Sequence, residues 1–166
     1  MALSGFSTTS YIIGDGSVEK LRDYKDERIG LVIDENIVKA LNLDQLLYHD
    51  IFAHSDYKIL CNVPAEPSLA MMEEPIQAVR DFMPQRIIGI GGGAVMDVAK
   101  ALWVFAEFPK MTWEEALKPY NVPMTDKKLK LTVIPTTSGT GSETTGCSVM
   151  KDQDNRKRMI LSKFVV

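Results

Sequence analysis

At 166 residues the chain has room for one compact domain with its own core, and two independent domains would be crowded. A hydrophobic content of 45% with 25% charged residues is ordinary for a soluble globular protein, and no stretch approaches the roughly 20 apolar residues that a membrane helix needs. A formal net charge of -3, with one short basic run at residues 156–158, argues against a nucleic-acid partner.

Apolar runs rich in β-branched residues alternate with amphipathic stretches along the chain. In chain order the pattern predicts a strand at 11–13, a helix at 17–24, a strand at 29–33, a helix at 36–47, a strand at 58–61, a helix at 68–82, a strand at 86–90, a helix at 94–106, a short helix at 113–117 and a strand at 131–134. Strands that are separated by helices imply parallel crossovers. We therefore predict an α/β fold, a Rossmann-like doubly wound, mostly parallel sheet with flanking helices.

The last third of the chain is less regular. Residues 118–130 contain prolines and the polar cluster Asp126-Lys127-Lys128, which is typical of a connecting loop. Residues 147–150 and 159–161 could form a short antiparallel pair around a turn at 152–155. The chain ends at 162–166 within an apolar run that has no stop signal, which predicts that residues 1–166 are one domain of a longer protein.

The cysteines and the first residues of the chain bear on the cellular compartment. Cys61 and Cys147 lack the CxxC spacing of a zinc knuckle and lie among apolar or small residues, so buried free thiols are expected. The first residues have no basic region followed by an apolar core, unlike a secretory signal. A cytoplasmic protein without a membrane partner is the expectation.

The strongest local motif is a strand that runs through Gly91, Gly92 and Gly93 directly into a helix beginning near Ala94. Glycine lets the backbone approach an oxyanion closely or take a positive φ, and the free N–H groups of a helix start face the same point. Residues 89–94 also satisfy the G-x-G-x-x-G/A spacing of dinucleotide sites. The motif predicts a phosphate-binding turn, and the alternative is a tight turn with a purely structural role.

An acid that could bind a ribose follows a different strand. The region about 20 residues after the glycines, where the usual fingerprint has its acid, offers only Glu114 and Glu115 in a weakly patterned stretch. Asp34 instead comes directly after the strand at 29–33, at the sheet edge where ligands bind. Asp34 could accept from both ribose hydroxyls and would repel a 2′-phosphate, favouring NAD over NADP. It could equally be the N-cap of the next helix.

A second motif, residues 134–145, follows the strand at 131–134 and consists mostly of small and hydroxyl-bearing residues. Thr136, Thr137, Thr140 and Thr145 offer hydroxyl donors and acceptors at the same sheet edge as the glycine turn. A flexible surface linker is the alternative. Pro135 stiffens the start of this loop and favours a binding role.

Together these two motifs resemble the iron-containing, group III alcohol dehydrogenases, in their amino-terminal half, over essentially the whole chain. Residues 91–100 resemble the family's Gly-Gly-Gly-Ser-x-x-Asp-x-Ala-Lys segment, and residues 135–143 match its Pro-Thr-Thr-x-Gly-Thr-Gly-Ser-Glu segment without a break. Residues 14–17 and 66–67 also resemble family features. The family's serine is Ala94 here, which removes one hydroxyl donor to a phosphate and costs about 0.5–1.5 kcal/mol of binding.

The resemblance implies roles for individual residues. Gly91, Gly92, Gly93 and Ala94 would hold the coenzyme pyrophosphate, Asp34 the adenosine ribose, and Asp97 would lie near the nicotinamide. Thr136, Thr137, Thr140 and Thr145 would line the adenine and phosphate side, and Val149 with Lys157, or Arg158 in another register, would complete the cleft. The resemblance also implies a homo-oligomer that oxidises or reduces a small alcohol or carbonyl with NAD, NADP being possible.

In the family the metal, iron(II) or zinc(II), is held by one aspartate and three histidines of a helical carboxyl-terminal half. This chain has only His49 and His54, whose spacing does not place both on one helical face, so they are predicted to be surface or core residues. We expect no catalytic and no metal-binding residue within residues 1–166, and no activity from them alone. Glycerol dehydrogenases, dehydroquinate synthases and a non-catalytic nucleotide-binding module remain alternative readings of the same motifs.

Overall fold

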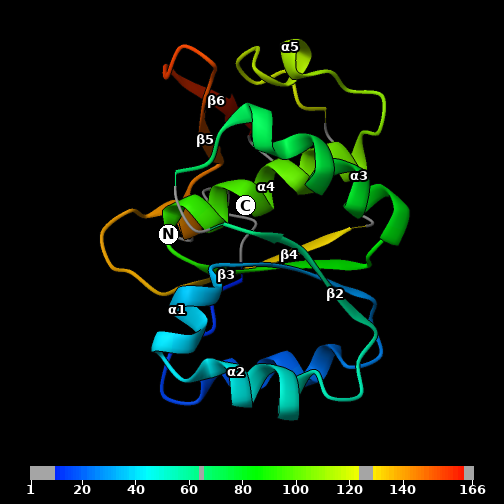
Figure 1. Ribbon diagram of the computed structural model, residues 1–166, viewed down its shortest axis with the longest axis vertical. Coiled ribbons are helices and arrows are strands. Elements are labelled where there is room, and N and C mark those ends of the chain that lie inside the picture. The colour runs from blue at the N-terminus through cyan, green and yellow to red at the C-terminus, as the bar shows by residue number, and fades with distance from the viewer. Residues whose placement is uncertain (1–9, 64–65, 124–128, 163–166) are drawn as a thin grey trace, which may run out of the picture.

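The computed structural model describes residues 10–63, 66–123 and 129–162 (Figure 1). Four strands form one parallel sheet: β1 (Ile29–Ile33), β2 (Tyr57–Asn62), β3 (Arg86–Gly91) and β4 (Lys130–Pro135). Their order across the sheet is β2-β1-β3-β4. Two further strands, β5 (Cys147–Lys151) and β6 (Lys157–Leu161), pair antiparallel as a separate hairpin.

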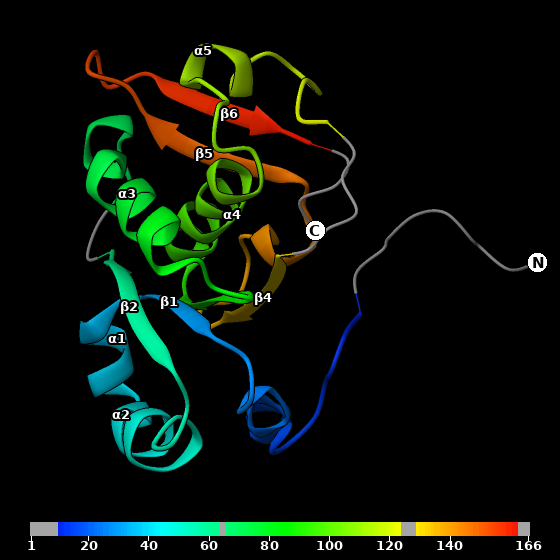
Figure 2. The same ribbon diagram turned by 90° about the vertical axis from the view of Figure 1, so that its right-hand side faces the viewer.

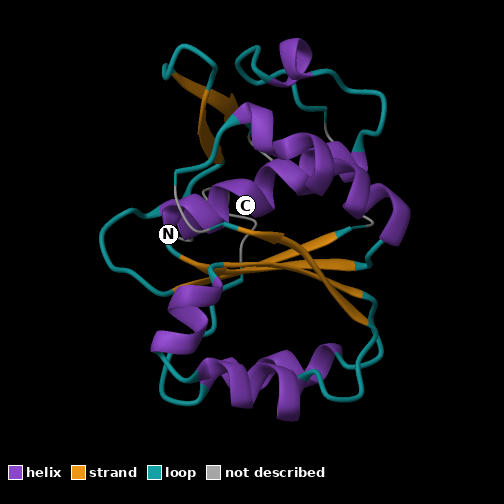
Figure 3. Cartoon of the chain, viewed as in Figure 1, coloured by secondary structure: helices purple, strands orange, loops and turns teal. Residues whose placement is uncertain are grey.

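Helices cover both faces of the parallel sheet (Figures 1 and 3). One face carries the 3-10 helix η1 (Ser17–Tyr24), α1 (Glu35–Ala40), α2 (Leu43–Leu46) and the π-helical turn η2 (Leu47–Ile51). The other carries η3 (Leu69–Met72), α3 (Glu73–Phe82) and α4 (Gly93–Glu107), with the β5-β6 hairpin and α5 (Trp113–Ala116) stacked beyond them (Figure 2). Across the described part of the chain, no helix has both the length and the apolar character that a bilayer crossing would need.

The central strands separate two apolar cores. Every residue of β1 is buried: Ile29, Leu31 and Ile33 pack toward α1 and α2, whereas Val32 packs toward α3 and α4. Because side chains alternate between the faces of a strand, a strand buried on both faces has no polar positions. This explains why the apolar runs in the sequence are continuous and not alternating.

The predicted α/β fold is confirmed, with differences in detail. The strand predicted at 11–13 is wrong: the segment pairs with no strand in the described part of the chain, and Ile13 is 90% exposed. The helix predicted at 36–47 is interrupted, because Asn42 takes a left-handed φ of 53° between α1 and α2. The helix predicted from residue 68 begins as the 3-10 turn η3, and residues 17–24 are 3-10 helical throughout.

The other strands, α4, the short helix α5 and the hairpin around residues 152–155 are confirmed. Both cysteines are free, with Cys61 buried and Cys147 half-buried. Burial raises the pKa of the Cys61 thiol to about 11, so this thiol is unreactive near neutral pH. The polar cluster 126–128 and the apolar run at 163–166 lie outside the described residues.

Candidate functional site

The strand order places a reversal point between β1 and β3. From β1 the chain crosses to β2 on one side, and then returns past β1 to β3 and β4 on the other. In open α/β sheets the carboxyl ends of the two strands at such a reversal flank a crevice where ligands bind. Asp34 follows β1 and Gly92 follows β3. The amide of Thr136, after β4, donates to the carbonyl of Gly91 at 3.0 Å, so all three predicted segments meet at this edge.

The turn after β3 exposes the start of the longest helix. Helix α4 begins at Gly93, and Gly92 is its N-cap with a φ of -76°. Within the described residues the amides of Gly93, Ala94 and Val95 donate to no protein acceptor; the first amide of the helix to do so is that of Met96, to Gly92 at 3.1 Å. Free amides together with the helix dipole favour an anion at this point.

Close packing explains most of the glycines here, and positive φ explains none of them. A Cβ on Gly91 would lie 2.4 Å from Cγ2 of Val95, and one on Gly89 would lie 2.9 Å from Cβ of Ala99. These two glycines therefore let α4 lie directly on the sheet. Helix packing therefore accounts for Gly91 without a ligand, as the structural alternative for this turn predicts.

The next two glycines face the threonine loop. A Cβ on Gly92 would lie 3.2 Å from Oγ1 of Thr137, and one on Gly93 would lie 3.1 Å from Cγ2 of Thr140. The threonine side chains thus line the turn, and both residues are exposed. A bound phosphate would meet backbone amides on one side and these threonines on the other.

Asp34 is the N-cap of α1, which is one of the two roles predicted for it. Its Oδ1 accepts from the amides of Asn36 at 2.9 Å and Ile37 at 3.3 Å, at the start of α1. Such a cap leaves a half-buried carboxylate fixed at the carboxyl end of β1. Capping and ribose binding are compatible, because the hydrogen bonds of the cap use only Oδ1.

One threonine of the loop has an unsatisfied polar atom. Oγ1 of Thr136 is buried and has no hydrogen-bond partner among the described residues. Burying a hydroxyl without a partner is costly, so such an atom is a candidate for contact with a ligand. This atom and the free amides of α4 are the two observations that fit a phosphate-bearing coenzyme.

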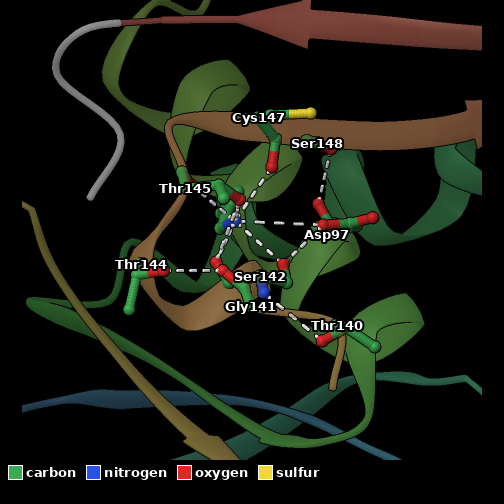
Figure 4. A network of polar contacts seen from close by, with 9 residues as sticks. Asp97, Thr140, Gly141, Ser142, Thr144, Thr145, Cys147 and Ser148 are labelled. Carbon is green, nitrogen blue, oxygen red and sulfur yellow. Dashed lines mark hydrogen bonds and ion pairs between the residues drawn. The ribbon is translucent and has the colours of Figure 1, made fainter.

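Asp97 lies one helical turn into α4 and faces the β5 side (Figure 4). Its Oδ1 accepts from the hydroxyl of Ser142 at 2.7 Å and lies 3.9 Å from Nζ of Lys100. The side chain is 15% exposed, and burial raises the pKa of its carboxyl despite the hydrogen bonds from Ser142 and the amide of Val149. The backbone of Val149, a predicted site residue, therefore contacts Asp97.

The basic residues of β6 separate into two environments. Arg158 donates to Oδ2 of Asp152 at 2.7 Å and so belongs to the hairpin turn. Lys157 is exposed at the start of β6, opposite Lys151, where its charge helps to lower the pKa of the Glu66 carboxyl. Of the two alternatives, Lys157 is the one whose side chain makes no hydrogen bond or ion pair of 4 Å or less with another described residue.

No role was predicted for Lys100 or Ser142, but Nζ of Lys100 donates to the hydroxyl of Ser142, which in turn donates to Asp97. Figure 4 shows Ser142 beside Asp97 in this polar network. Lys100 falls among buried apolar residues of α4, and a lysine within such a helix is the signal that could have identified it. Both histidines are exposed near η2, on the opposite side of the sheet. The described residues contain no group of three or more histidine, cysteine or acidic side chains that could hold a metal.

Known proteins resemble this chain in sequence and in fold. A profile described as iron-containing alcohol dehydrogenase matches residues 8–166. The NADPH-dependent butanol dehydrogenase of Clostridium saccharobutylicum is 34% identical over 152 residues, which cover 91% of this chain and 39% of that protein. The alcohol dehydrogenase of Thermococcus barophilus is 32% identical over 158 residues, covering 92% of this chain and 42% of that protein.

Among solved structures, the iron-containing alcohol dehydrogenase of Thermococcus thioreducens superposes with a TM-score of 0.73 at 30% identity, covering 92% of this chain and 42% of that one. The chain thus spans about two fifths of the length of these relatives. A match over nearly all of residues 1–166 in both sequence and fold establishes the family. The chain belongs to the iron-containing alcohol dehydrogenases.

Proposed function

We propose that residues 1–166 are the coenzyme-binding part of an NAD(P)-dependent alcohol dehydrogenase that transfers a hydride between a nicotinamide and a small alcohol, aldehyde or ketone. The observation that carries the proposal is the free amino-terminal turn of α4, which lies at the sheet reversal beside Asp34 and the threonine loop. A diphosphate placed there would accept hydrogen bonds from the amides of Gly93 and Ala94. The unsatisfied hydroxyl of Thr136 supports the same placement.

The remaining predicted residues would complete the cleft. Asp34 would accept hydrogen bonds from the adenosine ribose, and Asp97, Val149 and Lys157 would lie toward the nicotinamide. The described residues do not fit a catalytic metal, and we place the iron(II) or zinc(II) site outside them. When bound, such an ion would act as a Lewis acid on the substrate oxygen. The part played by this chain is then to bind and orient the coenzyme.

Coenzyme titration tests the proposal directly. We expect NADH to quench the tryptophan fluorescence of the purified protein and to bind more tightly than NADPH, because the carboxylate of Asp34 would repel a 2′-phosphate. The substitution Asp34→Asn should keep the N-cap, since asparagine caps as well as aspartate. Removing the charge should shift the NADPH-to-NADH affinity ratio toward NADPH by about tenfold, corresponding to roughly 1.4 kcal/mol. An unchanged ratio would place the ribose elsewhere.

The nature of the ligand separates this proposal from a non-catalytic nucleotide-binding module. Titrations with ATP and with inorganic phosphate use the same glycine turn but offer no nicotinamide. Preference for NADH over both supports the dehydrogenase. Tighter binding of ATP, or equal binding of phosphate alone, would favour the module.

A protein consisting of residues 1–166 alone should be inactive. The described residues provide no metal site, so adding iron(II) or zinc(II) should not restore alcohol oxidation. The measurement is NADH formation at 340 nm with NAD and a series of primary and secondary alcohols, with each metal added in turn. Turnover by this chain would show that hydride transfer needs no residue beyond it.

A further inference from the structure

The network around Asp97 is centred on a buried lysine. Lys100 lies three residues beyond Asp97 in α4, almost one full helical turn, and is only 1% exposed. Its Nζ donates to the carbonyls of Ser142 at 2.5 Å, Thr145 at 2.8 Å and Cys147 at 2.8 Å, and to the hydroxyl of Ser142 at 2.9 Å. The carbonyls come from one short stretch, residues 142–147, and converge on a single point (Figure 4).

This geometry requires the charged form of the lysine. An ammonium has three protons and no acceptor, and here several oxygens surround it. Burial lowers the pKa of Lys100, while the nearby Asp97 opposes that change. Carbonyl oxygens that point toward one another repel unless a cation or donor lies between them. The lysine therefore does for this stretch what a bound monovalent cation does in other loops.

Lys100 makes most of the polar contacts between this stretch and α4. Residues 142–144 form a single 3-10 turn, η4, which begins after Gly141 in the left-handed region, and β5 starts at Cys147. The hydroxyl of Ser148 adds one bond, to the carbonyl of Asp97 at 2.7 Å. The amide of Val149 donates to the carboxylate of Asp97, and the other polar contacts between residues 142–149 and α4 within the described residues involve Lys100 or Ser142.

The lysine is also connected to the candidate coenzyme site. Ser142 accepts from Lys100 and donates to Oδ1 of Asp97, so it fixes the carboxylate proposed to lie near the nicotinamide. The amide of Ser142 donates to Oγ1 of Thr140 at 3.3 Å, and Thr140 lies against Gly93 at the start of α4. A contiguous series of contacts thus runs from Lys100 to Asp97 and, through Thr140, to the glycine turn at the start of α4.

We propose that Lys100 is a positioning residue for coenzyme binding: its buried ammonium gathers the carbonyls of residues 142–147 and thereby sets the positions of Thr140 and Asp97. The inference rests on the proposed function for its coenzyme part. The ordering of the stretch can be tested without any coenzyme. Lys100 need not contact the coenzyme at any stage.

The substitution Lys100→Met tests the role of the charge, because methionine keeps an unbranched apolar side chain of similar length. Lys118→Met is the matched control, since Lys118 is 58% exposed and forms a surface ion pair with Glu114. In the full-length protein we expect Lys100→Met to raise the Kd for NADH at least tenfold and to speed amide hydrogen exchange within residues 142–147 at least tenfold. Lys118→Met should change neither value by more than twofold.

Chemical rescue separates charge from volume. Lys100→Ala leaves a space that propylammonium matches in length and charge, so added propylammonium should restore slow exchange at residues 142–147 and tighten NADH binding at least threefold. Propan-1-ol at the same concentration has a similar size without the charge and should restore neither. A purely space-filling lysine would give no difference between these two additives.

The outcomes separate this inference from the proposed function. Failure of the unsubstituted protein to bind NADH would overturn the proposed function, and with it the coenzyme part of the inference, while the exchange measurement would still judge the ordering of the stretch. Normal NADH binding and unchanged exchange in Lys100→Met would overturn the inference alone. Should Lys100→Met not fold, Ser142→Ala decides: it removes the bridge to Asp97, and binding within twofold of the unsubstituted protein would overturn the inference.

Discussion

Gly91→Ala is expected to destabilise the protein by about 1–3 kcal/mol, the usual range for overpacking a core. The new Cβ would lie 2.4 Å from Cγ2 and 2.7 Å from Cβ of Val95. A rotamer change cannot relieve the second contact, because the Cβ of Val95 is fixed to the helix backbone. The first turn of α4 must therefore move away from β3, and the turn proposed to bind phosphate moves with it.

An opposing effect is smaller. Replacing glycine by alanine reduces the freedom of the unfolded chain, which stabilises by about 0.4–1 kcal/mol where the backbone permits it. Gly91 has no positive φ, so this gain applies in full and the steric cost still exceeds it. Urea unfolding followed by circular dichroism should show a lower midpoint with an unchanged slope.

Gly92→Ala is the matched control for this experiment. Its added Cβ would lie 3.2 Å from Oγ1 of Thr137, an exposed side chain that can rotate away. The small steric cost and the entropic gain nearly cancel, so stability should change by less than about 1 kcal/mol. Equal losses in the two variants would show that contact with Val95 does not determine the choice of glycine at position 91.

Arg86→Met is expected to cost about 3 kcal/mol of stability, at the lower end of the range for breaking a buried ion pair. Arg86 is 8% exposed, and its Nε lies 2.7 Å from Oε2 of Glu27. Its Nη1 donates to Oγ1 of Thr132 at 2.8 Å, and its Cζ lies 3.6 Å from the ring centroid of Tyr24. The residue thus ties η1 and the segment after it to the amino ends of β3 and β4, and methionine would leave the carboxylate of Glu27 short of one partner.

Lys130→Met is the control for this pair, because Lys130 contacts the same carboxylate from the surface. Its Nζ lies 2.7 Å from Oε1 of Glu27, but its side chain is 55% exposed. A solvent-screened pair contributes roughly 0–1 kcal/mol, so this variant should lose much less stability than Arg86→Met. Similar losses in both variants would contradict the assignment of Arg86 as the main partner.

Acid pH should reduce the difference in unfolding free energy between Arg86→Met and the unsubstituted protein. Burial raises the pKa of the Glu27 carboxyl, but the hydrogen bonds from Arg86 and Lys130 outweigh it and hold the pKa below its usual 4.5. A lowered carboxyl pKa contributes stability that is fully present above the unfolded value and is lost as the pH falls through the folded value. The unfolding free energies of Arg86→Met and of the unsubstituted protein, measured from pH 7 to pH 3, should therefore approach each other as the pH falls.

Local sequence patterns determined most of the fold. Continuous apolar runs predicted β1 and β3 because both faces of these strands are covered, and continuous burial leaves no alternation to interpret. The strand predicted at 11–13 shows the limit of such patterns. Apolar residues there match a strand in type, but no strand in the described part of the chain pairs with them, and pairing depends on residues far away in sequence.

The sequence by itself determined the fold class, the family and the position of the glycine turn, because each depends on residues that are close together in the chain. Only the tertiary structure decided that Lys100 gathers the carbonyls of residues 142–147 and that Arg86 pairs with Glu27. The contacts of Lys100 join residues that are 42 to 47 positions apart, and those of Arg86 with Glu27 span 59. Propensity and spacing describe the chain locally, whereas burial of a charge and its compensation are set by which distant segments the fold brings together.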